Sequence, residues 1–108
     1  MIERLNIIIK ERISDPTLNI ESLSAEFGIS RVHLHRKLKE LCQQTPSSYL
    51  RNIRLEHAAY LMRTKKISVS EAAYAVGFNS PQYFTNCFKE RYGMSPLAYI
   101  EKYFNQEG

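Results

Sequence analysis

The sequence predicts an all-α fold of about seven helices, in which two similar halves are joined by a long linker helix. Apolar residues recur at helical spacing, and no segment of useful length alternates between apolar and polar residues as a half-buried strand would. Capping residues, helix-opening prolines and helix-ending glycines follow one another in order along the chain. A pattern in the first half also recurs 50 residues later in the second half, which indicates two copies of one structural unit.

The first half predicts three helices. The first covers residues 2–13, where apolar residues recur at helical spacing, and Asp15-Pro16 ends it. Asn19 can cap the second helix and Gly28 can end it. Ser30 caps the third helix, and the residues expected on its inner face are Leu34, Leu38 and Leu41.

The second half predicts four helices. Thr45-Pro46 is a start signal for the linker helix, which covers residues 47–64 and is roughly 27 Å long at about 1.5 Å per residue. Residues 68–71 form a capping box that opens the fifth helix. Ser80-Pro81 opens the sixth helix and Ser95-Pro96 opens the seventh.

The repeat defines two helix-turn-helix units. Only a tight turn fits between the second and third helices, so these helices must cross steeply. In this motif the second helix projects its N-terminal half into a major groove about 12 Å wide. The linker helix could hold two such helices about one DNA turn, roughly 34 Å, apart, so the sequence predicts contact with two successive major grooves. The expected subdomains are residues 1–46 and 67–108, with the linker helix over residues 47–66.

Composition indicates an ordinary globular chain of 108 residues, with 44% hydrophobic and 24% charged residues. No apolar run approaches the roughly 20 residues that span a bilayer, and the N-terminus lacks the pattern of a signal peptide. We therefore expect a cytoplasmic location and no membrane contact by this segment. Cys42 and Cys87 are expected to be reduced thiols there.

The positive charge is concentrated in one part of the chain. The net charge is +4, and residues 31–66 hold nine Lys or Arg against two acidic residues, Glu40 and Glu56. A local excess of this kind is typical of a surface that binds nucleic acid. The alternative is a solvated helical face whose lysines serve solubility, and charge alone does not separate the two.

A family resemblance rests on motifs in both halves. They are residues 30–39, Arg54-Leu55, Ala58-Ala59, Ala72, Ala75, Gly77-Phe78, Tyr83-Phe84, Phe88-Lys89 and residues 93–96 with Tyr99. Over about residues 20–103 the chain resembles the DNA-binding domain of AraC/XylS-type transcription regulators. The resemblance implies two helix-turn-helix units on double-stranded DNA at a promoter, usually as an activator that contacts RNA polymerase.

Three further segments, residues 15–19, 36–39 and 53–55, are similar to output domains of hybrid two-component regulators from gut bacteria. Those domains end much larger sensor proteins. The resemblance therefore implies that the chain is a fragment, with upstream sensor and receiver domains as partners. The alternative is a small stand-alone regulator of the same family.

Helix geometry predicts which residues read bases. With Leu34 and Leu38 inward, the outward residues near the start of the third helix are Arg31, Val32, His35 and Arg36. Arginine can donate two hydrogen bonds to guanine, histidine can bond a base edge and valine can contact a thymine methyl. The resemblance places base contacts at Val32, His35 and Arg36. Alternatives for Arg36 are a phosphate contact or an ion pair with Glu40.

On the sixth helix, Phe84 and Phe88 are expected to face inward, which leaves Pro81, Gln82, Thr85 and Asn86 toward the groove. The amides of Gln82 and Asn86 can pair with adenine. The family often has a basic residue at the position of Asn86, so this unit has fewer charges for the backbone. The alternative is that Asn86 lies in solvent. Family members use the position of Tyr83 both for packing and for groove contacts.

Phosphate contacts require donors at the groove margins. The candidates are Lys39, Arg51, Arg54 and Lys89, together with Ser30 and Ser80 and the backbone amides that follow them. For Arg54 the alternative is an internal ion pair that holds the linker helix.

Residues for other chemistry do not come together in the sequence. His33 and His35 diverge on a helix, and no Cys-x-x-Cys or His-Glu-x-x-His motif, glycine-rich phosphate loop or nucleophile–base arrangement is present. We therefore expect no enzymatic activity, no cofactor and no metal. The alternative function is a protein-interaction module that uses the same fold without DNA readout.

Overall fold

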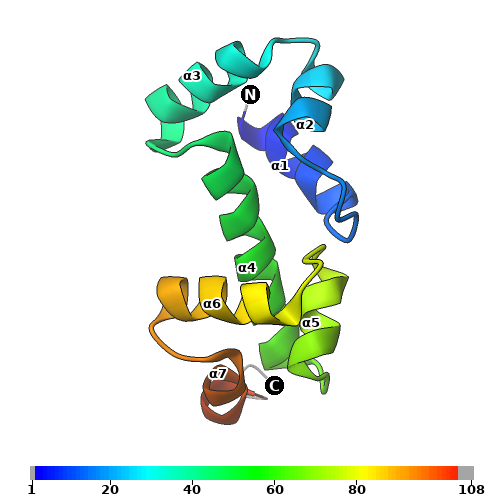
Figure 1. Cartoon of the computed structure of the whole chain (residues 1–108), viewed down its shortest axis with the longest axis vertical. Helices are drawn as coiled ribbons and strands as arrows, with labels where there is room; N and C mark the ends of the chain where they lie inside the picture. Colours follow the sequence, from blue (N-terminus) through cyan, green and yellow to red (C-terminus); the bar gives the residue numbers. More distant parts are fainter. Residues whose placement is uncertain (1, 105–108) are drawn as a thin grey trace.

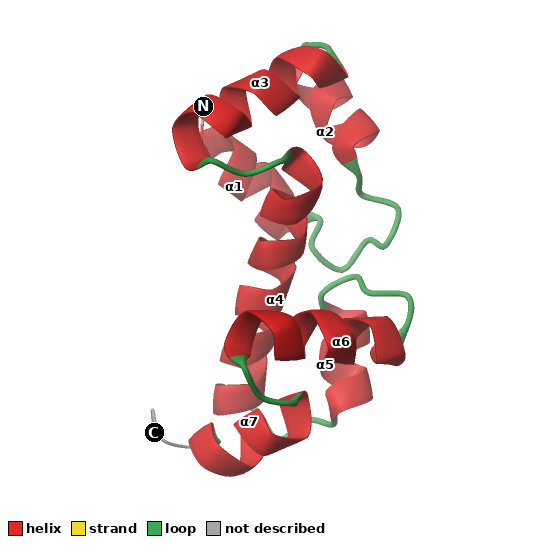
Figure 2. Cartoon of the chain, turned by 60° about the vertical axis from the view of Figure 1, so that its left-hand side comes forward, coloured by secondary structure: helices red, strands yellow, loops and turns green. Residues whose placement is uncertain are grey.

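The computed structural model describes residues 2–104, and within this range it contains seven helices and no strand, which confirms the predicted all-α class. Figures 1 and 2 show the arrangement. The helices are α1 (Ile2–Glu11), α2 (Ile20–Phe27), α3 (Arg31–Cys42), α4 (Pro46–Thr64), α5 (Val69–Ala75), α6 (Pro81–Tyr92) and α7 (Pro96–Tyr103).

Helix α4 is the central element, with α1–α3 packed at one end and α5–α7 at the other (Figure 1). The described chain is elongated, with extents of 42 × 27 × 23 Å. Two separate apolar cores lie along α4. The first contains Leu5, Ile9, Leu34 and Leu38, and the second is centred on Phe84 and Phe88 with Met62 of α4.

The helix starts follow the local sequence signals. Asn19 and Ser68 each form a capping box, the second with Glu71. Ser30 accepts a hydrogen bond from the backbone N–H of His33 at 3.0 Å. Gly28 ends α2 with φ of 69°, a left-handed conformation that glycine adopts without steric cost. These contacts confirm the predicted caps.

Two expectations about packing are wrong. Helix α1 ends at Glu11, so Ile13 lies in the following loop and packs into the second core instead of continuing the first helix. Leu41 is 56% exposed, so it lies outside the first core and not on the inner face of α3. Cys42 and Cys87 are free thiols, with Cys87 buried.

Candidate nucleic-acid interface

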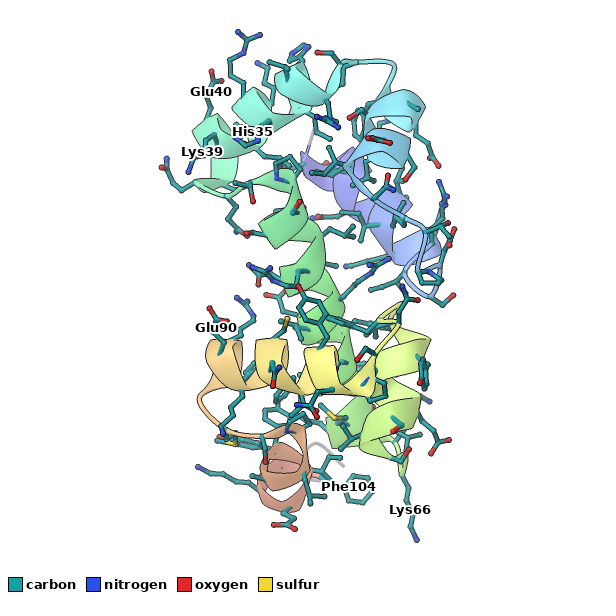
Figure 3. All side chains as sticks on the ribbon, viewed as in Figure 1. His35, Lys39, Glu40, Lys66, Glu90 and Phe104 are labelled. Atoms are coloured by element: carbon teal, nitrogen blue, oxygen red, sulfur yellow. The ribbon has the colours of Figure 1, made fainter. Side chains whose placement is uncertain are left out.

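Helices α3 and α6 lie at opposite ends of α4 and run across it in the same direction (Figures 1 and 2). Glu40 and Glu90, which match in the sequence repeat, project in the same sense from corresponding ends of these helices (Figure 3). The two helix-turn-helix units are therefore related mainly by a shift along α4. That arrangement presents two equivalent helix faces on one elongated molecule.

The outward side of α3 is available for contact. Leu34 and Leu38 are fully buried, whereas Arg31, Val32, His35 and Arg36 are exposed, Val32 to 74%. Within residues 2–104 Arg36 forms no ion pair with Glu40, so that alternative is not realised. Its guanidinium forms no hydrogen bond or ion pair within residues 2–104.

Arg31 is the exception on this face, because it pairs with Glu21 of α2 at 3.0 Å. The two side chains are 65% and 73% exposed, and ion pairs this exposed contribute little free energy. Exchange of Glu21 for a DNA group would therefore cost little.

The outward side of α6 is neutral. Gln82 and Asn86 are exposed, while Pro81 and Thr85 are half-buried at the edge of the same face. The Nε2 of Gln82 donates to the Oδ1 of Asn86 at 3.2 Å, so the two amides form one hydrogen-bonded pair. One amide's carbonyl and the other's NH₂ remain free to contact a base.

The position of Tyr83 allows both packing and groove contact, the two roles that family members use there. Its side chain is 53% exposed, and its ring centroid is 5.8 Å from that of Phe78. One edge packs on the turn before α6, and the rest of the ring borders solvent.

A hollow of about 470 Å³ separates the N-terminal ends of α3 and α6. Three arginines and one acid line it, together with apolar and amide side chains: Arg31, Arg51, Arg54, Glu21, Leu18, Leu50, Asn19, Asn79 and Tyr83 among others. With three arginines against one acid, the hollow carries a net positive charge.

Most predicted phosphate contacts lie at the surface. Lys39 and Lys89 are exposed, and the Nη2 of Arg51 lies 3.4 Å from the Oγ of Ser48 at the rim of the hollow. The hydroxyls of Ser30 and Ser80 accept backbone N–H groups of their own helices. Each hydroxyl proton remains free to donate to a phosphate.

The structure does not support the predicted phosphate role of Arg54. Its Nη2 donates to the backbone carbonyl of Asp15 at 2.7 Å, and its Nε is buried without a hydrogen-bond partner. Burial lowers the pKa of Arg54, and the nearby Asp15 carboxylate opposes that shift. This contact is closer to the alternative role, an internal ion pair that holds the linker helix. The partner atom of Arg54 is, however, a carbonyl oxygen and not a carboxylate.

The sequence carries no signal that links Arg54 to the first half of the chain. Ile13 and Asp15 lie in the α1–α2 loop, 39 residues or more before Arg54, and no spacing pattern links them to it.

The described residues form no cluster of three or more His, Cys, Asp or Glu that could hold a metal ion. None of the helices in residues 2–104 is both long and apolar enough to cross a membrane.

A family model described as a helix-turn-helix domain matches residues 23–102. The chain belongs to this family, the AraC-type helix-turn-helix domains. The match covers both helix-turn-helix units and the linker helix between them.

Two curated relatives show where such AraC-type domains occur. Histidine kinase P4 of Formosa agariphila is 35% identical over 99 residues, which is 92% of this chain and 7% of that protein. The transcriptional activator RhaS of Escherichia coli is 32% identical over 96 residues, or 86% of this chain and 34% of RhaS. The chain thus spans only 7% and 34% of the lengths of these two relatives.

Two solved structures share the fold of this AraC-type domain. The C-terminal domain of AraT, a response regulator from Geobacillus stearothermophilus, superposes with a TM-score of 0.88 at 30% identity, covering 97% of this chain and 87% of AraT's domain. The DNA-binding domain of the transcriptional factor AdpA, in complex with a target DNA, superposes with a TM-score of 0.86 at 29% identity, covering 94% and 90%.

Proposed function

We propose that this domain is a sequence-specific DNA-binding transcription regulator that inserts α3 and α6 into successive major grooves. The observation that carries the proposal is the placement of two equivalent helices, running in the same direction with open outward faces, at the two ends of α4. Binding in a single groove would require only one such helix. Binding in two successive grooves on one face of a duplex requires two helices in the same orientation.

The proposed roles follow from exposure and chemistry. Base contacts come from Arg31, Val32, His35 and Arg36 on α3 and from Pro81, Gln82, Thr85 and Asn86 on α6. Phosphate contacts come from Lys39, Arg51 and Lys89, and from Ser30 and Ser80 at the helix starts. Arg54 is left out of the second group because its guanidinium holds Asp15.

The biological setting belongs to the same proposal. RhaS is a transcriptional activator, and AraT is a response regulator. We therefore infer activation of transcription in the cytoplasm, without enzymatic activity in this domain. RNA polymerase and upstream signalling domains of a two-component protein are its inferred protein partners.

The deciding experiment is selection of bound duplexes from a random DNA pool at near-physiological salt, followed by sequencing. Two short enriched motifs with centres about 10 base pairs apart are expected, since that is one helical turn of DNA. Enrichment of a single motif would mean that only one of the two helices reads bases. No enrichment by the folded domain would contradict the proposal and favour a protein-interaction module.

A further inference from the structure

The two halves of the molecule meet directly at one loop in addition to their shared helix α4. Residues 12–18, the strut loop, connect α1 to α2 and belong to the first half of the chain. Ile13 of this loop is nevertheless buried in the second core, where Val76 and Phe78 also lie. The strut loop therefore contacts both helix-turn-helix units.

The strut loop is firmly attached to the first half. Arg12 pairs with Asp15 at 3.3 Å and also with Glu26 of α2. The Asp15 carboxylate accepts hydrogen bonds from the backbone N–H and the hydroxyl of Thr17 at 2.9 and 2.6 Å. Leu18 closes the loop in the first core. These contacts attach the loop to α2 and to the first core at several points.

At its other side the strut loop touches the turn before α6. Gly77 has φ of +90°, and a Cβ atom at this position would lie 2.5 Å from the carbonyl oxygen of Ile13. That separation is too short for any side chain, so the backbone of the second half rests directly on the backbone of the loop. Gly77 is thus required for this approach as well as for its own φ.

Arg54 of α4 joins the contact from the linker helix. Its Nη2 donates to the Asp15 carbonyl at 2.7 Å, and the same Nη2 lies 2.9 Å from where a Cβ of Gly77 would be. The guanidinium of Arg54 therefore links α4 both to the strut loop and to the turn that leads into α6.

We propose that the strut loop, fastened by Arg54 against Gly77, sets the distance and angle between α3 and α6 and so determines which spacing of two DNA half-sites the protein accepts. Arg54 is a positioning residue in this proposal, since it acts through the loop and not through DNA. The proposal rests on the DNA-binding function proposed above.

The test in DNA uses duplexes in which the two selected motifs are moved apart or together by one base pair. One step displaces a half-site by about 3.4 Å and rotates it by about 35°, so wild-type binding should weaken at least about tenfold. In Arg54→Met the penalty should fall to about threefold or less, because α6 can shift to follow its half-site.

A phosphate role for Arg54 predicts a different result. Affinity would then fall equally at every spacing, and the slope of log affinity against log salt would become less steep by about 1.

Ile13→Ala loosens the strut loop without changing charge, and should reproduce the wider spacing tolerance. Arg91→Met is the matched control. It removes a guanidinium contact of 2.7 Å between α6 and Glu56 of α4, which does not involve the strut loop, and should keep the wild-type spacing penalty.

A second measurement needs no DNA. Spin labels on Glu40→Cys and Glu90→Cys, in a Cys42→Ser and Cys87→Ala background, report the distance between α3 and α6 (Figure 3). Double electron–electron resonance should give one narrow distribution for the parent and a broader one for Arg54→Met, with circular dichroism confirming that both fold. An unchanged distribution, or a broadened one with an unchanged spacing penalty, would overturn the proposal. If selection yields no bipartite site, the distance distribution alone decides whether the strut loop holds the two helices.

Discussion

At the scale of single residues, the two outward helix faces differ in chemistry although they share one scaffold. The face of α3 carries arginine and histidine, whereas the face of α6 carries an amide pair. Charged donors and neutral amides prefer different base edges, guanine for arginine and adenine for glutamine or asparagine. We therefore expect the two half-sites to differ in sequence.

Arg36 is the residue whose removal should change specificity most. Arg36→Ala should cost roughly 1–3 kcal/mol on the selected duplex and relax discrimination at one base position, because a bidentate guanine contact is lost. Binding of every single-base variant of that duplex measures both effects. Lys37→Ala, at an exposed neighbour outside the proposed contacts, is the control. Equal weakening of all variants would assign Arg36 to phosphate.

Gln82 and Asn86 should act together, because they are hydrogen-bonded to each other. Gln82→Ala and Asn86→Ala should each weaken binding through the second motif only. The double variant should lose less than the sum of the two, with a coupling of about 0.5 kcal/mol or more. A double-mutant cycle on one duplex gives this number. Additive losses would mean that the two amides contact DNA independently.

At the scale of elements, the starts of α2 to α7 are each secured by a short capping signal, and the capping box of α5 should respond to pH. The carboxylate of Glu71 accepts from the backbone N–H of Ser68 at 2.9 Å, and this hydrogen bond lowers the pKa of Glu71 below its usual 4.5. A carboxyl group with a lowered folded-state pKa stabilises the fold above its unfolded value. That contribution is lost as pH falls through the folded-state pKa.

Glu71→Gln should therefore reduce the loss of stability between pH 7 and pH 3, because glutamine does not titrate. Urea unfolding followed by circular dichroism at several pH values compares the two chains. Glu101→Gln, on an exposed helical site, should behave as the wild type does. The same acid dependence in Glu71→Gln and wild type would show that the capping box does not contribute to it. Asp15, whose pKa is lowered by the Thr17 hydroxyl and amide, titrates in all three chains.

At the scale of the whole molecule, the positive charge spread over α3, α4 and the hollow should control affinity for any duplex. Three charged phosphate contacts, Lys39, Arg51 and Lys89, predict a slope of log affinity against log salt of about −3. Lys39→Gln should make that slope less steep by about 1 and weaken all sequences alike. Titrations at four salt concentrations measure it. A slope near zero would contradict a DNA-binding function.

Local structure was predictable because its causes lie within a few residues. Ser68 and Glu71 satisfy each other's backbone donors three positions apart, and a proline opens a helix through its own fixed φ. The outward positions of α3 follow from the 3.6-residue period with Leu34 and Leu38 inward. The same period predicts Leu41 inside, which is wrong, because periodicity does not say which part of a helix face a neighbouring element covers.

Seven helices, the caps of α2 to α7, two related units and the outward faces of their second helices follow from local signals along the chain. How the two halves are held relative to each other depends on contacts that form only in the folded molecule. Ile13 enters the core of the other half, and Arg54 turns inward to the carbonyl of Asp15. Caps and periodicity act over one or two helical turns, whereas Arg54 and Asp15 are 39 residues apart and no spacing pattern links them.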